Sequence, residues 1–228
     1  FRSWDAGGLY PWSSFASAGT VVLSSDSTED DEDKGGGVEG TGAHKVLIEG
    51  LDSEYNLVTD TLITNGTSTR TSTVEFLRVF RAYVSEAGTT GTNEGTLTIT
   101  KGGVTVAQIK TAGSPTATGL GQTFMSVYTV PAGYTGYIYQ FNASTAKADG
   151  DVFLMQREQN ATWRSRDIIH TNSNSTLYQR IRTLTTPESE ISYVKRKEDN
   201  RSLDDKIYKL RYVVPKELVN TRDPVPGF

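Results

Sequence analysis

The stretch Gly95-Thr-Leu-Thr-Ile-Thr-Lys-Gly-Gly-Val-Thr-Val-Ala-Gln-Ile109 decides the fold class of this chain. Apolar and polar residues alternate on both sides of Gly102-Gly103, which is the pattern of a strand with one buried face. Two adjacent glycines accept the positive φ angles that a two-residue hairpin turn requires. The stretch therefore predicts a β-hairpin.

The same period of two residues continues outward from this hairpin. Val46 and Ile48 alternate with polar residues, and the pattern resumes at Leu57 after Asp52-Ser-Glu-Tyr55, a loop length suited to a second hairpin. The apolar spacing of Thr73–Val84 also permits a helical stripe, but its threonine, valine and aromatic content favours a strand. Further strands are expected at 125–130 and 134–141, paired across Pro131-Ala-Gly133, and at 152–158, 161–170, 176–184, 189–196 and 206–214.

About ten short strands at close spacing, with little helical pattern, indicate an all-β protein. We expect a β-sandwich or jelly-roll-like barrel with extended N- and C-terminal arms. Composition suggests four regions: an aromatic N-terminal arm at 1–25, an acidic glycine-rich loop at 26–43, a β-sandwich body at 44–214 that could divide near 145, and an extended C-terminal tail at 215–228.

The composition argues against several classes of function. The 228 residues include no cysteine, which excludes disulfides, thiolate metal sites and cysteine nucleophiles. The 2 histidines, His44 and His170, lie far apart and next to no nucleophile motif, so we expect no enzyme and no cofactor. A net charge of -4 argues against direct nucleic-acid binding, and no apolar stretch is long enough to predict a membrane span.

An acidic run, Asp26-Ser-Thr-Glu-Asp-Asp-Glu-Asp33, precedes three glycines. Like charges this close repel one another and resist burial, so we expect a solvated loop or linker. Its carboxylates are also a calcium candidate, although the spacing departs from that of a calcium-binding loop. The residues concerned are Asp26, Asp30, Asp31 and Asp33.

The N-terminal arm, Phe1-Arg-Ser-Trp-Asp-Ala-Gly-Gly-Leu-Tyr-Pro-Trp-Ser-Ser-Phe15, is aromatic without a strand or helix period. Such a segment is costly to leave in water, so it docks either on its own domain or on a neighbouring subunit. Aromatic residues dominate interface hot spots. The expected anchors of a subunit or partner contact are Phe1, Trp4, Tyr10 and Trp12, with Phe228 at the other end of the chain.

A second aromatic row lies at Tyr137, Tyr139 and Phe141, which share one face if the segment is a single strand. An exposed row of this kind would form a glycan-binding platform, and a buried row would belong to the core.

Six strings occur in order along the first two thirds of the chain: Trp4-Asp-Ala-Gly-Gly-Leu-Tyr-Pro11, Leu47-Ile-Glu-Gly-Leu-Asp-Ser-Glu-Tyr-Asn56, Thr61-Leu-Ile-Thr-Asn-Gly-Thr67, Phe76-Leu-Arg-Val-Phe-Arg-Ala82, Asn93-Glu-Gly-Thr-Leu-Thr-Ile-Thr100 and Tyr128-Thr-Val-Pro-Ala-Gly-Tyr-Thr-Gly-Tyr137. As an ordered set they resemble virion structural proteins of tailed bacteriophages. The resemblance covers roughly residues 1–145 and implies an all-β, non-enzymatic virion component, without distinguishing the head from the tail.

From the resemblance and the aromatic arms we expect an oligomeric capsid decoration or cement subunit. Its partners would be other virion proteins, the major capsid protein above all, and further copies of itself, and it would be assembled into the virion in the host bacterial cytoplasm. The alternative is a tail- or fibre-associated module that binds a receptor or glycan.

Overall fold

The structure is a computed structural model, and it describes residues 4, 6, 10–111, 121–138, 141–144, 150–158, 161–171, 176–179, 183–185 and 190–196. These residues form antiparallel β-sheets and one short 3-10 turn, η1 (Trp12–Phe15). The prediction of an all-β fold is confirmed. Among the described residues, no helix has the length and apolar character that a membrane span needs.

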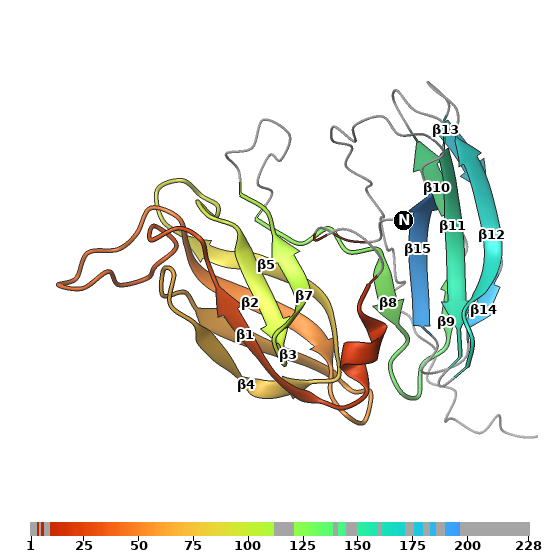
Figure 1. The fold of residues 1–228 in the computed structure, drawn as a ribbon, viewed down its shortest axis with the longest axis horizontal. Helices are drawn as coiled ribbons and strands as arrows, with labels where there is room; N and C mark the ends of the chain where they lie inside the picture. Colours follow the sequence, from red (N-terminus) through yellow and green to blue (C-terminus); the bar gives the residue numbers. More distant parts are fainter. Residues whose placement is uncertain are drawn as a thin grey trace, which may run out of the picture.

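The first body of the molecule contains seven strands in two sheets (Figure 1). Apolar residues from both sheets belong to one buried cluster, so the two layers form a sandwich. One sheet has the order β4 (Arg70–Phe76), β1 (Gly19–Ser24), β6 (Leu97–Lys101), β7 (Val104–Ile109), and the other β3 (Leu57–Ile63), β2 (Ala43–Leu51), β5 (Arg78–Ala87).

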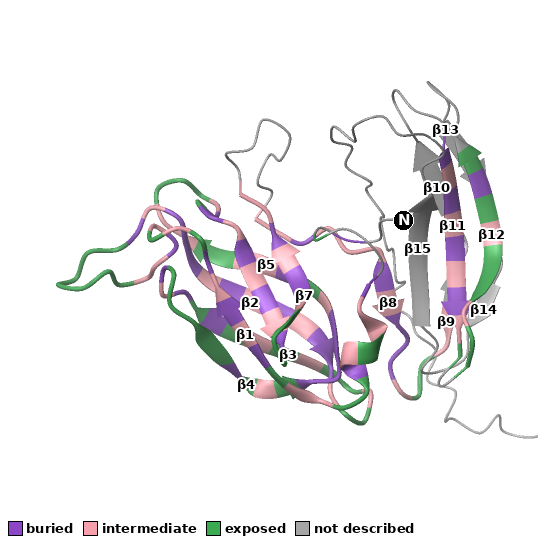
Figure 2. Ribbon diagram, viewed as in Figure 1, coloured by how far each residue is buried: buried purple, intermediate pink, exposed green. Residues whose placement is uncertain are grey.

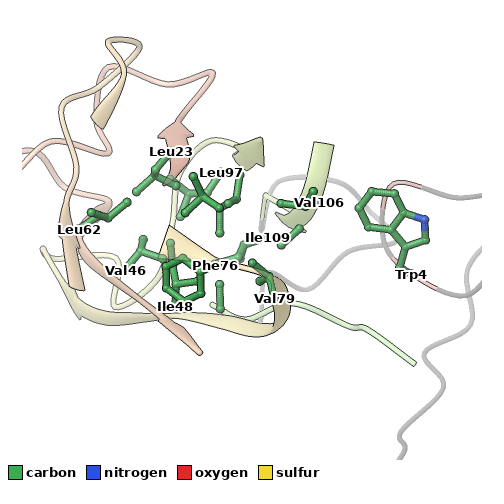
Figure 3. Packing of buried hydrophobic residues seen from close by; sticks show 14 of the residues in the cluster. Trp4, Leu23, Val46, Ile48, Leu62, Phe76, Val79, Leu97, Val106 and Ile109 are labelled. Carbon is green, nitrogen blue, oxygen red and sulfur yellow. The ribbon is translucent and has the colours of Figure 1, made fainter. Parts of the chain in front are cut away.

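Alternating side chains build the core of this sandwich. Leu97 and Ile99 on β6 are fully buried and face Val46 and Ile48 on β2, while the residues between them are partly exposed. Figure 2 shows the resulting stripes, and Figure 3 shows the packed side chains. Burying each such side chain contributes about 1.5–3 kcal/mol to folding.

Both predicted hairpins of this body are confirmed. β6 and β7 pair across Gly102 and Gly103, whose φ angles of 57° and 80° are those of a tight turn between twisted strands. β2 and β3 pair from Lys45 opposite Ile63 to Leu51 opposite Leu57, across the loop that begins at Asp52.

At one open side of the sandwich, a side chain bridges the two sheets. The Asp60 carboxylate on β3 accepts hydrogen bonds from the backbone N–H groups of Thr73 (2.7 Å) and Val74 (3.2 Å) on β4. This carboxylate satisfies donors that an edge strand would otherwise present to solvent or to another chain.

The second body is built around a four-stranded sheet and lies beside the first in Figure 1. Two small two-stranded sheets accompany the larger one. The large sheet has the order β12 (Arg164–Thr171), β11 (Gly150–Arg157), β15 (Glu190–Arg196), β8 (Val127–Thr129), and the small sheets pair β10 (Phe141–Ser144) with β13 (Thr176–Gln179) and β14 (Thr183–Thr185) with β9 (Gly136–Ile138).

Three strand predictions need correction. Thr73–Val84 is not one strand, because the chain crosses between the sheets at Leu77, whose N–H bonds to the Leu51 carbonyl. The expected pair 125–130 and 134–141 does not form: β8 pairs with β15 and β9 with β14. The turn between them bonds instead to the first body, through Ala132 N and Tyr55 O (3.0 Å). The segment 176–184 divides into β13 and β14, and the strand expected at 206–214 lies outside the described residues.

The boundaries between the regions also differ from the prediction. Residues 19–24 form β1 in the middle of a sheet, so the arm is shorter than 1–25. The division of the body falls between β7 and β8, after Ile109 and before Val127, rather than near 145. The predicted tail at 215–228 lies outside the described residues.

Candidate functional site

The described N-terminal residues before β1 lie between the two bodies. We call Trp4 and residues 10–16 the N-terminal strap; η1, at its end, sits between the first sandwich and β8 in Figure 1. Trp4, Tyr10 and Phe15 are buried and belong to the core cluster of the first body. The strap has no regular apolar period because its rings fill gaps between sheets instead of following one strand or helix face.

The rings of the strap contact one another closely. Tyr10 is central: its ring centroid lies 5.3 Å from that of Trp4, 5.0 Å from that of Trp12 and 5.3 Å from that of Phe15. The first two pairs meet edge to face and the third is stacked, and both arrangements are favourable for aromatic rings.

The Tyr10 hydroxyl bridges the two sheets of the sandwich along the edge formed by β5 and β7. Asp60 bridges them along the other edge, formed by β3 and β4. The Tyr10 hydroxyl donates toward the carbonyl oxygens of Val79 on β5 (3.2 Å) and Val106 on β7 (3.0 Å). We call this contact line between β5 and β7 the seam. Figure 3 shows Trp4 beside Val106 at the seam.

Two cations of the first body hold the end of the strap. Arg78, only 6% exposed, donates to the Phe15 carbonyl (2.6 Å), and its guanidinium lies 5.4 Å from the Phe15 ring centroid. Lys101, 8% exposed, places its ammonium 5.1 Å from the same ring and donates to the Ser17 carbonyl. Burial, with a smaller contribution from the Arg78 charge and against the opposing Glu75, lowers the pKa of Lys101 from 10.5 to about 8.

The second body contacts the strap through Trp163 and Arg157. The rings of Trp12 and Trp163 lie 5.2 Å apart, and the Arg157 guanidinium lies 5.4 Å from the Trp12 centroid and 4.9 Å from the Trp163 centroid. Arg78 reaches Trp12 from the first body, at 5.7 Å. Trp12 therefore lies between cations from both bodies, and the 3 tryptophans of the chain belong to one cluster.

We call this cluster the aromatic junction. Its members are Trp4, Tyr10, Trp12, Phe15, Arg78, Lys101, Arg157 and Trp163. Each cation–aromatic contact contributes about 0.5–2 kcal/mol and each ring pair about 0.5–1.5 kcal/mol. Chemically, the junction can hold three parts of the chain in one arrangement.

The connection between the bodies adds further contacts. Thr123 N donates to Ala82 O (2.9 Å), which continues the sheet of the first body beyond β5. Tyr128 on β8 packs against Phe80 on β5, with ring centroids 5.0 Å apart, and burial raises the pKa of Tyr128. Val127 of β8 belongs to the core cluster of the first body although β8 pairs in the second. β8 is thus shared by both bodies.

The structure places the predicted anchors of the arm as follows. Trp4 and Tyr10 are 7% and 4% exposed within their own chain, and Trp12 is partly exposed. Of the two alternatives for the arm, docking on its own domain is the one seen in this single chain. Phe1 and Phe228 lie outside the described residues, and their role in a subunit contact stays a prediction.

The expectation that the acidic run is wholly solvated is wrong for Asp30. Its side chain is fully buried and accepts hydrogen bonds from Ser25 Oγ (2.5 Å), Ala43 N (2.8 Å), Glu94 N (2.8 Å) and Gly95 N (2.9 Å). A buried carboxylate is tolerated when donors surround it in this way. Asp30 therefore fastens the acidic loop to two other parts of the first body.

The calcium candidate is not supported by this arrangement. Asp26 accepts from Thr96 N (2.7 Å), Asp31 from Asp33 N (3.1 Å) and Asp33 from Gly35 N (2.8 Å), so the carboxylates serve separate backbone donors. Within the described part of the chain, no three acidic or histidine side chains gather in a way that could hold a metal ion.

The predicted glycan platform does not lie on one strand. β9 ends at Ile138 and β10 begins at Phe141, and the two strands belong to different sheets, so Tyr137 and Phe141 do not share a strand face. Tyr139 and the side chains of the other two residues lie outside what the structure describes.

One of the two histidines is buried and the other is exposed. His44 is buried and its Nε2 lies 2.8 Å from the Gly40 carbonyl. The His170 side chain is 80% exposed, and its Nδ1 lies 2.5 Å from Asp151 Oδ1 across the β11 and β12 pair. His44 stands near the start of β2 and His170 near the end of β12.

Sequence reasoning missed the three cations of the junction and the role of Asp30. Arg78, Lys101 and Arg157 come from strands far apart in the sequence, and alternation alone could not show which ring each would face. Comparison of the chain with protein-family models, curated proteins and solved structures found no significant match.

Proposed function

We propose that this chain is a non-enzymatic structural protein of a bacteriophage virion, acting as a capsid-surface decoration or cement subunit. Two things support the proposal: the resemblance of the six ordered strings to virion structural proteins, and an all-β fold, which is the fold that this resemblance implies. Its partners would be the major capsid protein and further copies of itself.

The aromatic junction is the observation that carries the proposal. A cement subunit must contact two neighbouring shell proteins at a fixed spacing. If its two parts moved freely, ordering them on the shell would consume part of the binding free energy. Trp12, held between Arg78 of the first body and Arg157 of the second, fixes that spacing before binding.

Stabilisation would then follow from mass action. A subunit that binds the assembled shell, and does not bind dissociated capsid protein, shifts the equilibrium toward the shell by RT ln(1 + [L]/Kd). A standard interface of roughly 800 Å² on each partner would suffice for specific binding. No chemical step is needed for this role.

The test uses shells that lack this chain. Purified chain is titrated onto them, and both the bound amount and the temperature at which the shells open are measured. We expect saturable binding at a fixed ratio to the major capsid protein and a higher opening temperature. The same chain unfolded by heat before addition serves as the control. Absence of saturable binding would contradict the proposal.

A further inference from the structure

The N-terminal strap is joined to the body by a short hinge. Ser17 and Ala18 link the strap to β1, and Ser17 is exposed. Small, exposed residues lose few packed contacts when their backbone angles change, although the Ser17 carbonyl would release its hydrogen bond from Lys101. The strap can therefore move as a unit while β1 stays in its sheet.

Side chains hold the strap to the body. The backbone hydrogen bonds Trp12 N to Tyr10 O (2.9 Å) and Ser14 N to Pro11 O (3.0 Å) lie within the strap itself. Among the contacts to the rest of the molecule are the Tyr10 hydroxyl, the buried rings of Trp4 and Phe15, and the cations Arg78 and Lys101. Trp12 also contacts Arg157 and Trp163 of the second body. Releasing the strap breaks these contacts and leaves the strand ladders of the sandwich intact.

Docking of the strap carries two costs. The Trp4 indole Nε1 is buried and has no hydrogen-bond partner among the residues that the structure describes. Lys101 is buried beside the like charge of Arg78, with Phe15 and Ser17 of the N-terminal segment over it. The unsatisfied donor opposes docking, and the desolvation of Lys101 offsets part of what its contacts with Phe15 and Ser17 contribute, so opening the strap costs less than these contacts alone suggest.

An empty seam would also be unfavourable. Without the strap, the seam would expose Val79 and Val106, both now fully buried, and the two carbonyl oxygens that the Tyr10 hydroxyl serves. An apolar surface of this kind attracts an occupant. The occupant whose fit the structure demonstrates is this strap, and every copy of the chain carries one.

We propose that the strap is exchangeable: Trp4 and residues 10–16 of one copy dock in the β5–β7 seam of a second copy, so that two chains associate by reciprocal strap exchange. The exchanged pair keeps the contacts of the closed chain and differs from it at the hinge, which makes exchange an inexpensive route to association. High local concentration favours exchange over self-docking.

Strap exchange would link neighbouring copies of the chain on a shell. Only this location rests on the proposed function. The isolated chain therefore suffices for the test. Wild-type chain and 15N-labelled wild-type chain are concentrated together and then examined by native mass spectrometry. We expect dimers of mixed label, with a fraction that grows with protein concentration.

Two full-length variants identify the strap as the linking element. In one, Tyr10→Ala with Trp12→Ala disables the strap and leaves the seam; in the other, Arg78→Ala with Lys101→Ala disables the docking contacts and leaves the strap. Only mixed dimers can pair an intact strap with a body that keeps Arg78 and Lys101. We expect the mixture to contain several-fold more mixed dimer than either variant forms alone.

Two results would overturn strap exchange. One is a wild-type chain that stays monomeric at every concentration. This outcome does not depend on whether any variant folds. The other is a strap variant that dimerises alone as readily as the wild type. Shell binding is measured separately from dimerisation. A chain that stays monomeric and still binds shells to saturation would therefore contradict strap exchange and support the proposed function.

Discussion

The indole of Trp12 packs against the indole of Trp163, with ring centroids 5.2 Å apart and planes tilted by 46°. The first indole belongs to the strap before β1 and the second to the segment that leads into β12. Arg157 lies within cation–aromatic distance of both rings. This pair therefore links the N-terminal strap to the second body.

Removing the Trp12 ring should uncouple the two bodies. Trp12→Ala deletes the surface that Arg78 contacts from one side and Arg157 and Trp163 from the other. By calorimetry we expect one cooperative transition for the wild type and two separate or broadened transitions for the variant. Trp12→Phe, which keeps a ring, should retain most of the coupling. Tyr134→Ala, at an exposed ring of the connection, is the matched control. A single, unshifted transition in Trp12→Ala would refute this role.

The Tyr10 hydroxyl should contribute to stability through the seam. Tyr10→Phe keeps the ring contacts and removes the donor to Val79 O and Val106 O, so we expect a loss of about 1 kcal/mol in the free energy of unfolding by urea. Tyr134→Phe removes an exposed hydroxyl and should change stability by less than about 0.5 kcal/mol. Equal losses in both variants would show that the hydrogen bonds of Tyr10 between the sheets do not contribute to the free energy of unfolding.

Lys101 should make stability depend on alkaline pH. Its pKa is about 8 in the folded chain and 10.5 when solvated, so between these values the unfolded chain binds more protons and stability rises with pH. We expect a gain of about 1–3 kcal/mol over this range by urea unfolding.

Lys101→Met should abolish that gain. At pH 7 it buries no charge but loses the hydrogen bond to Ser17, so we expect its stability to stay within about 1 kcal/mol of the wild type. Lys45→Met is the control. The salt bridge to Glu86 raises the pKa of Lys45, so Lys45 makes stability depend on pH only above pH 10.5. A gain that persists in Lys101→Met would assign the pH dependence to another group.

Asp30 should be the one carboxylate of the acidic run on which folding depends. Asp30→Asn turns one acceptor into a donor facing Ser25 and Gly95, and we expect a loss of about 3 kcal/mol. Asp33→Asn alters an exposed carboxylate of the same loop and should cost less than about 0.5 kcal/mol. Similar losses would mean that net charge, rather than the buried bonds of Asp30, governs the loop.

The local features of the fold could be predicted from sequence where adjacent residues decide the outcome. The β6–β7 hairpin follows from Gly102-Gly103 and the alternation around it, which need no knowledge of distant residues. The pairing of β8 with β15 could not be predicted in this way, because three residues carry too little pattern to select a partner.

Burial of a charge was the feature hardest to anticipate. Asp30 stands among other acids in the sequence, and only the folded chain brings donors from residues 43, 94 and 95 to its carboxylate. The strap shows the same limit. Its aromatic content predicted docking, but the seam it fills is made by β5 and β7, which the sequence does not place together.

The proposed role makes this chain a part of an assembled particle. The decisive measurement is its copy number in purified virions, determined by quantitative mass spectrometry against the major capsid protein. A decoration or cement role predicts on the order of hundreds of copies per virion, in a fixed ratio set by the symmetry of the shell. A chain that is synthesised in infected cells and is absent from purified virions would contradict this role.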